Sequence, residues 1–235
     1  QRYKKNLTWI NFDDSNLDIR SADLPKFIAI EGPIGVGKTS LAKLLSRTLG
    51  YETWLEASVS NPFLERFYEN KSQAALQTQL FFLFERARQL DLMRQAHLFN
   101  PLRVTDFLIE KESIFAKLNL DPDELKLYEN IYQHLNIEPP RPDLVIYLQA
   151  STEILLERIH TRGNKAERSV DKNYVNQLVD KYTEFFHYYE TSPLLIVNSA
   201  AIDPVSNDKD YQELLSLIAN TKKGRHYYNP VPEIL

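Results

Sequence analysis

The sequence predicts an α/β fold of the doubly wound type, in which helices cover both faces of a parallel sheet. Three apolar segments of strand length, at 27–31, 143–149 and 193–198, are each followed by an amphipathic segment of helix length. Strands that alternate with helices form parallel sheets, because each return to the sheet needs a crossover. The middle segment, DLVIYLQ, is almost continuously apolar, which is typical of a strand buried on both faces.

Three of the 6 glycines in the chain, Gly32, Gly35 and Gly37, lie within one short stretch. This stretch, GPIGVGKT (32–39), matches the pattern GxxxxGK[ST] between an apolar strand and an amphipathic helix. In such a P-loop, glycines let backbone N–H groups wrap around phosphate oxygens, and the helix N-terminus adds partial positive charge. The sequence therefore predicts a P-loop NTPase-type domain that binds the phosphates of a nucleotide. The residues expected at the phosphates are Gly32, Gly35, Val36, Gly37, Lys38, Thr39 and Ser40.

Two side chains of the loop have defined chemical roles in such domains. Lys38 is placed to reach the β- and γ-phosphates, and the Thr39 hydroxyl is placed to ligate Mg²⁺. The alternative is a chance match in a turn that binds nothing. The strand before the motif and the helix after it speak against that alternative.

Composition limits the remaining function classes. With 43% hydrophobic and 26% charged residues, the chain is typical of a soluble globular protein, and no apolar run approaches the ~18 residues that span a membrane. The absence of cysteine excludes zinc ribbons, iron–sulfur clusters and thiol nucleophiles. A net charge of −4 gives no reason to expect nucleic-acid binding. We expect a cytoplasmic protein with one domain at 27–235, preceded by a polar extension or linker at 1–26.

Hydrophobic periodicity predicts the other elements. Further strands are expected at 51–56 and 102–109. Helices are expected at 61–69, 73–98, 110–118, 121–136, 151–162, 171–190 and about 207–222. The long helix among them is predicted to bury Leu76, Leu80, Leu83, Phe84, Ala87 and Leu90.

Candidate chemical groups lie at the ends of these elements. Glu56 ends the second predicted strand, at the edge where open α/β sheets bind ligands, and its carboxylate could accept a proton from a hydroxyl. Arg158 and Arg162 lie four residues apart at the end of a helix, before the polar segment GNKAER (163–168). This pattern indicates a short mobile lid that carries arginines onto a transferring phosphoryl group. A solvated helix end that favours cations is the alternative.

Several spaced segments together resemble the deoxynucleoside kinase family, over about residues 27–218. They are IAIEGPIGVGKTSLAKLL (28–45), WLEASVSNPFLERFY (54–68), IFA (114–116) and VIYLQASTEILLERIHTRG (145–163). The resemblance implies transfer of the ATP γ-phosphoryl group to the 5′-hydroxyl of a deoxynucleoside. It also implies a five-stranded parallel sheet, a homodimer packed through helices and, from likeness to the bacterial purine-preferring branch, a purine substrate.

The resemblance also assigns roles to individual residues. Glu56 corresponds to the catalytic glutamate, and Arg158 and Arg162 take the phosphate roles. The nucleoside contacts that it implies are Tyr68 and Glu167 at the 3′-hydroxyl, Gln79 and Arg86 at the base, and Phe115 stacked on the base. Gln79 and Arg86 are seven residues apart, which is two helical turns and places them on one face of a helix.

One segment departs from the family pattern. Where the family has an acidic residue followed by arginine and serine, this chain has Asp106 followed by Phe107. Asp106 can still hold Mg²⁺ through water, but the arginine is absent. The acidic residue that faces the base in the family has two candidates here, Glu110 and Glu112.

Two other functions remain open on the sequence alone. A nucleoside monophosphate kinase of the thymidylate kinase type shares the P-loop and lid, but needs an arginine near the second-strand carboxylate, for which Arg66 and Arg86 are candidates. A catalytically silent homologue that serves as a structural subunit would explain the lost arginine. Such a homologue would be free to lose Lys38, Thr39 or Glu56, and this chain has all three.

Overall fold

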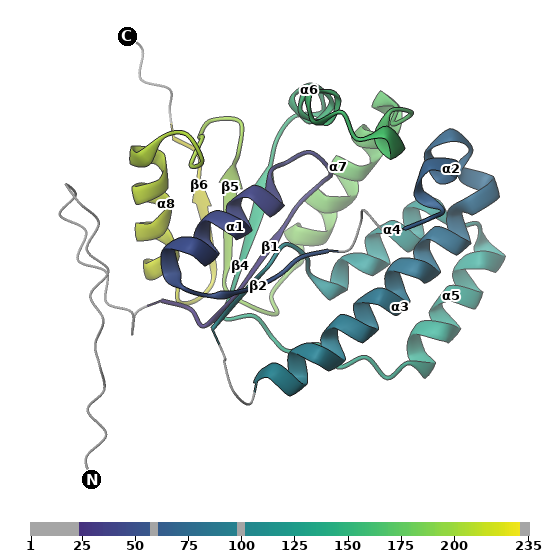
Figure 1. Ribbon diagram of the computed structural model, residues 1–235, viewed down its shortest axis with the longest axis horizontal. Helices are drawn as coiled ribbons and strands as arrows, with labels where there is room; N and C mark the ends of the chain where they lie inside the picture. The colour runs from purple at the N-terminus through teal and green to yellow at the C-terminus, as the bar shows by residue number, and fades with distance from the viewer. Residues whose placement is uncertain (1–23, 57–60, 98–101, 231–235) are drawn as a thin grey trace.

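Six strands, all parallel, form one sheet in the described part of the chain, in the order β2-β3-β1-β4-β5-β6 (Figure 1). The structure is a computed structural model, and it describes residues 24–56, 61–97 and 102–230. The strands are β1 (Phe27–Glu31), β2 (Glu52–Trp54), β3 (Arg103–Thr105), β4 (Leu144–Gln149), β5 (Leu194–Asn198) and β6 (Arg225–Tyr228). The chain adds strands first on one side of β1 and then on the other, so the doubly wound prediction is confirmed.

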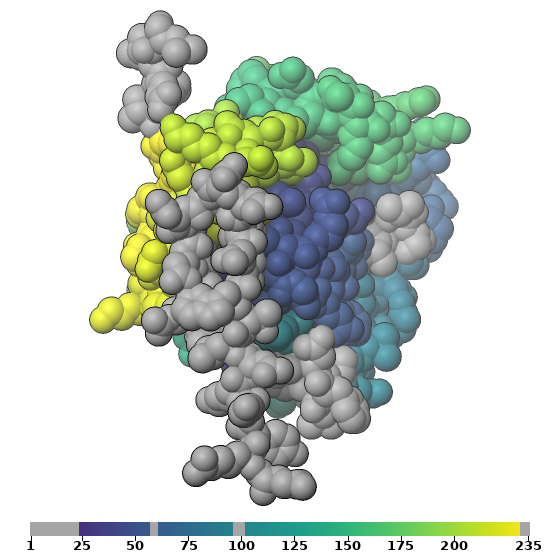
Figure 2. Space-filling view, turned by 60° about the vertical axis from the view of Figure 1, so that its left-hand side comes forward, coloured from purple at the N-terminus to yellow at the C-terminus, as the bar shows by residue number. Residues whose placement is uncertain are grey.

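Helices cover both faces of this sheet. They are α1 (Lys38–Leu49), α2 (Leu64–Glu69), α3 (Lys71–His97), α4 (Glu112–Asn119), α5 (Pro122–His134), α6 (Thr152–Arg162), α7 (Lys172–His187) and α8 (Asp208–Asn220). Two short 3₁₀ helices are η3 (Ile109–Lys111) and η4 (Lys165–Glu167). α1 and α8 lie side by side on one face (Figure 2), and α7 covers the other face together with parts of α3 and α4 (Figure 1).

The strand β1 shows why its segment is apolar throughout. Ile28 and Ile30 pack into the core beneath α1 and α8, whereas Phe27 and Ala29 pack into the core beneath α7. Successive side chains of a strand point to opposite faces, and both faces of this strand are covered. Removal of this apolar surface from water, at about 25 cal/mol per Å², is the main favourable contribution of the strand.

The sixth strand corrects the expectation of a five-stranded sheet. β6 pairs in parallel with β5, with Arg225 opposite Leu194 and Tyr228 opposite Val197. The Leu194 N–H also donates to the Gly224 carbonyl at 2.9 Å. The segment RHYY lies at the sheet edge with its side chains partly or fully exposed, so it has no apolar run that hydrophobic patterning could detect.

β3 is shorter than the strand predicted at 102–109. It ends at Thr105, whose hydroxyl donates to the Phe107 carbonyl at 2.8 Å. The next N–H along the chain, that of Leu108, donates to Glu31 Oε2 at 2.7 Å. These bonds to side chains compete with the ladder and turn the chain out of the sheet.

α3 packs through a narrower face than its sequence predicts. Leu83 and Leu90 are buried as predicted, but Phe84 is 50% exposed. Leu83 and Leu90 are two helical turns apart and share one face, while Phe84 is turned about 100° from Leu83 around the axis. Leu76, Leu80 and Ala87 are only partly buried.

The extension expected at 1–26 lies outside the described residues except for its last three. Of these, Leu24 packs in the core, and the Lys26 N–H donates to Asp143 Oδ2 at 3.0 Å. The start of the domain at residue 27 therefore stays a prediction. Within the residues that the structure describes, no helix has the length and apolar character to cross a bilayer.

Candidate active site

The P-loop joins β1 to α1 and is packed closely against its surroundings. Gly35 has a φ of +82°, and a Cβ at this position would lie 2.8 Å from the Leu155 carbonyl oxygen of α6. At Gly32, where φ is +151°, a Cβ would lie 2.5 Å from the Leu148 carbonyl oxygen. A side chain at either position would have to displace backbone, so glycine is required at both. The loop is thereby fixed against the end of β4 and against α6.

Lys38 begins α1 and reaches back across the loop. Its ammonium donates to the carbonyl oxygens of Gly32 at 2.7 Å and Pro33 at 3.2 Å. Burial lowers the pKa of Lys38; the Glu31 carboxylate opposes this effect and the Lys111 charge adds to it. An ammonium that is held by neutral carbonyl oxygens is well placed to bind a phosphate anion instead.

Thr39, Asp106 and Glu56 meet at the carboxyl edge of the sheet. Thr39 lies in the first turn of α1, Asp106 follows β3 and Glu56 follows β2. The Thr39 hydroxyl donates to Asp106 Oδ2 at 2.5 Å, and Asp106 Oδ1 accepts from the Glu56 N–H at 2.6 Å. This hydroxyl and carboxylate fit Mg²⁺, which prefers oxygen ligands and takes most of them from phosphates and water. The described residues contain no group of three or more His, Asp or Glu side chains that would form an all-protein metal site.

The Glu56 carboxylate is held between two cations. Its Oε1 accepts from Arg86 Nη2 at 2.6 Å, and its Oε2 accepts from Lys111 Nζ at 2.8 Å. Burial alone would raise the pKa of Glu56, but the Lys111 and Arg86 charges outweigh burial and hold this pKa well below its usual range. Glu56 is therefore ionised at neutral pH.

Arg86, predicted to contact the base, lies behind the cavity wall. It is 2% exposed, and besides Glu56 it pairs with Glu112 Oε1 at 2.9 Å. Its guanidinium carbon lies 4.4 Å from the centre of the Phe107 ring. Of the two candidate acidic residues, Glu112 lines the cavity beside the P-loop, whereas Glu110 lines a separate hollow between α4 and α5. A contact between Arg86 and a base stays a prediction.

A cavity of about 120 Å³ lies beside the P-loop and adjoins a larger cleft. The cleft, of about 1040 Å³, is lined by the P-loop, the end of α6 and the loop at 199–205. Gly35, Lys38, Thr39, Glu56, Arg162 and Glu167 line both spaces. A donor in the cleft and an acceptor in the cavity would therefore meet at these residues.

Most of the predicted nucleoside contacts line the cavity. They are Tyr68, Gln79, Phe115 and Glu167. Sequence reasoning missed other lining residues, among them Thr78, Phe82, Lys111 and Tyr174. Helical spacing could have indicated Phe82, which lies three residues after Gln79 on α3. Lys111 and Tyr174 come from other elements, and no sequence pattern connects them to the site.

Arg158 and Arg162 both lie near the end of α6 but have different partners. Arg158 donates to Ser199 Oγ at 3.0 Å, to the Ser199 carbonyl at 2.8 Å and to the Val36 carbonyl at 3.3 Å. Arg162 forms an ion pair with Glu167 of η4, and its side chain is 50% exposed. Arg158 thus joins the P-loop to the loop after β5, while Arg162 is the more exposed of the two arginines.

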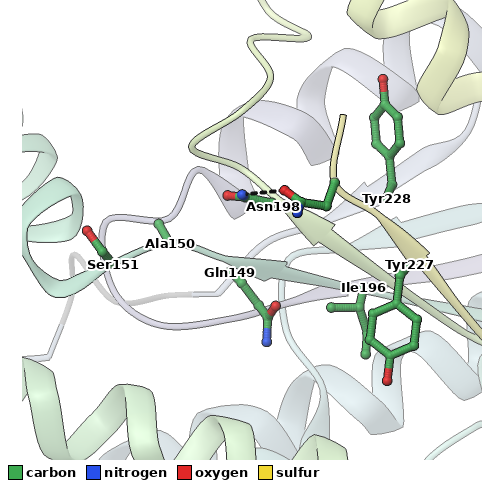
Figure 3. Close-up of a pocket in the computed structure, with 8 residues that line it drawn as sticks. Gln149, Ala150, Ser151, Ile196, Asn198, Tyr227 and Tyr228 are labelled. Atoms are coloured by element: carbon green, nitrogen blue, oxygen red, sulfur yellow. Dashed lines mark hydrogen bonds between the residues drawn. The ribbon is translucent and has the colours of Figure 1, made fainter. Parts of the chain in front are cut away.

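A separate cavity of about 320 Å³ lies at the carboxyl ends of β4, β5 and β6 (Figure 3). Its wall includes Tyr227 and the side chains of Asn198 and Asn229, which share a hydrogen bond of 2.7 Å. Among the described residues, no charged side chain lines this cavity. It therefore offers nothing that neutralises a phosphate, in contrast to the cleft at the P-loop.

The fold and the site define a class of protein: a P-loop phosphotransferase that moves a phosphoryl group from a nucleoside triphosphate to a small acceptor. The buried lysine of the loop, the hydroxyl–carboxylate pair beside it and the adjoining acceptor cavity carry this assignment. Residues 28–222 match the family model described as deoxynucleoside kinase. The chain belongs to the deoxynucleoside kinase family.

Individual relatives agree with the family match. A deoxyguanosine kinase of Bacillus subtilis (strain 168) is 37% identical over 193 residues, which cover 80% of this chain and 93% of the relative. A deoxyadenosine kinase of Dictyostelium discoideum is 35% identical over 186 residues, which cover 75% of this chain and 74% of the relative. The solved structure of deoxyadenosine kinase from M. mycoides with bound dATP is similar at a TM-score of 0.71 and 27% identity, over 82% of this chain and 98% of that chain. The protein is therefore a phosphotransferase that acts on a deoxynucleoside.

Proposed function

We propose that this enzyme transfers the γ-phosphoryl group of ATP to the 5′-hydroxyl of a purine deoxynucleoside in a Mg²⁺-dependent reaction. The observation that carries the proposal is the wall shared by the cleft and the cavity, where Lys38, Thr39 and Glu56 lie together. The purine preference is supported by the relatives named deoxyguanosine kinase and deoxyadenosine kinase, at 37% and 35% identity.

On the donor side, the P-loop would hold the phosphates of ATP. Lys38 would exchange the carbonyl oxygens of Gly32 and Pro33 for phosphate oxygens, which carry full charge. Thr39 and Asp106 would hold Mg²⁺, with water and phosphate oxygens completing its shell. When bound, Mg²⁺ neutralises charge that develops on the transferring phosphoryl group.

On the acceptor side, the cavity offers the groups that bind a nucleoside. The Gln79 amide presents one donor and one acceptor to the base edge, and the Phe115 ring presents an apolar face for stacking. Glu167 and Tyr68 would bind the 3′-hydroxyl. Burial, with the neighbouring Tyr174 and Glu167, raises the pKa of Tyr68 well above its usual value, so its phenol remains a hydrogen-bond donor.

Between the two sides, Glu56 would accept the proton of the 5′-hydroxyl. Its ionised carboxylate lines both spaces, so it can contact an acceptor that faces the P-loop. Arg162 would exchange Glu167 for the transferring phosphoryl group, because both spaces meet at this side chain. Such a contact would strengthen as charge develops during transfer.

The alternative acceptor, a nucleoside monophosphate, needs a cation free to bind its phosphate. Of the two arginines that favour this alternative on the sequence alone, Arg86 is already paired with Glu56 and Glu112. Arg66 is exposed on α2 and does not line the cavity. Neither of these two arginines therefore offers an unpaired charge to an acceptor phosphate in the cavity, which supports an uncharged acceptor.

The family resemblance supports a homodimer packed through helices, and we include this assembly in the proposal. Multi-angle light scattering of the full chain tests it. A dimer gives twice the chain mass of 27.5 kDa, and a single-chain mass rejects the dimer.

An acceptor panel tests the proposed reaction. The full chain with Mg·ATP is assayed on the four deoxynucleosides, the corresponding ribonucleosides and the deoxynucleoside monophosphates. We expect deoxyguanosine or deoxyadenosine to give the highest kcat/KM. A tenfold advantage for thymidine or deoxycytidine would reject the purine preference, and phosphorylation of monophosphates alone would reject the acceptor class.

Replacing Glu56 by glutamine tests its role as the base. Glu56→Gln should lower kcat by about 10²–10⁴ while nucleoside affinity, measured by calorimetry, changes less than about twofold. The amide keeps the shape of the carboxylate but cannot take the proton. Glu65→Gln, at an exposed position on α2, is the control. An unchanged kcat in Glu56→Gln would move the base role to another residue, with Asp106 the next candidate.

A further inference from the structure

In the loop after β3, this chain departs from the family pattern that the sequence analysis describes. The residue directly after Asp106 is Phe107, where that pattern has an arginine. The Phe107 ring is 3% exposed and lies beneath the Arg86 guanidinium, 4.4 Å from ring centre to guanidinium carbon. Phe107 does not line the cavity. The structure therefore brings no group from this position to the reacting atoms.

A lysine further along the same loop reaches the site instead. Lys111 ends η3 and is 3% exposed, and its Nζ lies 2.8 Å from Glu56 Oε2 and 3.8 Å from Glu31 Oε2. Burial alone would lower the pKa of Lys111, but Glu31 and Glu56 outweigh burial and raise it. Lys111 is therefore a charged ammonium fixed between two carboxylates, and it lines the acceptor cavity.

Glu31 helps to hold this lysine in position through their ion pair. Its carboxylate is fully buried and accepts from the N–H groups of Gly32 at 2.9 Å and Leu108 at 2.7 Å. Its Oε1 also accepts from the Tyr182 hydroxyl at 2.9 Å. One carboxylate thus connects the first residue of the P-loop to the loop that carries Lys111. The carboxylate that attracts the Lys111 ammonium is therefore itself held in place by hydrogen bonds.

We propose that Lys111 is a positioning residue for the transfer. It holds the Glu56 carboxylate toward the acceptor hydroxyl, and it reaches the site from the loop in which the arginine is missing. An ionised carboxylate has about four lone-pair directions. Lys111 occupies one on Oε2 and Arg86 occupies one on Oε1, so the carboxylate cannot rotate. The remaining lone pairs are left for the 5′-hydroxyl. This inference rests on the proposed role of Glu56 as the base.

A double-mutant cycle separates positioning through Glu56 from a structural role. The four proteins are the wild type, Lys111→Met, Glu56→Gln and the double variant, each assayed for kcat, KM and the stoichiometry of nucleoside binding. We expect Lys111→Met to bind nucleoside at full stoichiometry and to lower kcat by about 10- to 100-fold, with KM changed less than about threefold. In the Glu56→Gln background the same substitution should lower kcat by less than about threefold, because no base remains to be positioned.

Two further variants complete the experiment. Lys117→Met, at an exposed position on α4, is the matched control and should keep wild-type kcat. If Lys111→Met does not bind nucleoside at full stoichiometry, Lys111→Gln replaces it, because the amide keeps a polar group near the buried Glu31 carboxylate. An equal loss of kcat in both backgrounds, or a wild-type kcat in the folded Lys111 variant, would overturn the proposal. A wild-type kcat in Glu56→Gln alone would instead reject the base assignment, so the two failures are distinguishable.

Discussion

Five charged side chains of the site form a largely buried row in which negative and positive charges alternate. Glu31, Lys111, Glu56, Arg86 and Glu112 follow one another with N–O distances of 3.8, 2.8, 2.6 and 2.9 Å. Taking each ion out of water costs several kcal/mol, and a buried ion pair often contributes no net stability. Stability therefore does not explain this row. What it provides is geometry, because the Glu56 carboxylate at its centre is held by a cation on each side.

The residue that should decide base selectivity is Gln79. Gln79→Ala should lower kcat/KM for the best substrate by about 5- to 150-fold, or roughly 1–3 kcal/mol, because a buried polar edge of the base would be left unpaired. The loss should be smaller for poor substrates, which compresses selectivity. Steady-state kinetics over the acceptor panel measures both effects. Gln77→Ala, exposed on the same helix, is the control, and an equal loss in both variants would contradict the base contact.

At the scale of elements, the P-loop depends on its close approach to α6. A Cβ at Gly35 would lie 2.8 Å from the Leu155 carbonyl oxygen and 2.9 Å from Ile159 Cγ1. Gly50, at the end of α1, has a similar positive φ of +69° but nothing within 4 Å of a Cβ. A comparison of substitutions at these two glycines therefore separates the free-energy cost of a left-handed backbone from the cost of a steric clash.

Alanine at each position tests this difference. Gly35→Ala should lower the free energy of unfolding by about 3 kcal/mol and weaken ATP binding, because backbone strain and overpacking add. Gly50→Ala should cost about 1 kcal/mol and leave ATP binding unchanged. Chemical denaturation and ATP calorimetry measure the two effects. Equal losses in both variants would show that the contact with α6 does not constrain the loop.

The segment after α6 is expected to act as a lid through Arg162. Arg162→Ala should lower kcat by about 10- to 100-fold and change the nucleoside KM less than threefold, because its contact strengthens only as charge develops. Arg168→Ala removes an exposed arginine from the same segment and should be neutral. Steady-state kinetics decides between the two interpretations of this helix end. Wild-type kcat in both variants would favour a solvated helix end with no lid function.

At the scale of the whole molecule, the acceptor cavity lies at the half of the sheet that contains β1, β2 and β3. The cavity is lined by segments that follow β1, β2 and β3 and by residues of α1, α2, α3, α4, α6 and α7, while β6 lies at the opposite edge of the described sheet. β6 also lies beyond the segment at 28–222 that matches the family model. Arg225 of β6 donates to the carbonyl oxygens of Phe186 and His187 at 3.0 and 2.8 Å, which ties this edge to the end of α7.

Removal of β6 should therefore lower stability without changing the chemistry. Deletion of residues 224–235 should reduce Tm by about 5–10 °C, because the pairing with β5 and the contacts of Arg225 with α7 are lost. The nucleoside KM should stay within twofold of the full chain. A shorter deletion of 231–235 keeps β6 and is the control. A changed nucleoside KM in the longer deletion would show that the far edge of the sheet contributes to the acceptor cavity.

The sequence by itself determined the doubly wound fold class and the position of the P-loop. These features come from local patterns: a glycine motif between a strand and a helix, and apolar runs of strand length. The long helix was predicted at 73–98 and is found at Lys71–His97. The edge strand at 225–228 was not predictable, because exposed side chains carry no periodic signal.

The tertiary structure decided which charged groups surround Glu56. Arg86 lies 30 residues away along the chain and Lys111 lies 55 residues away, yet both donate to its carboxylate. A spacing pattern describes neighbours on one helix or strand, and these partners come from different elements. The partners of Glu56 are fixed by the order of β2, β3 and β1 in the sheet and by the turn at Thr105 that ends β3. The pairing of Lys111 with Glu56 therefore exists only once the strands have assembled.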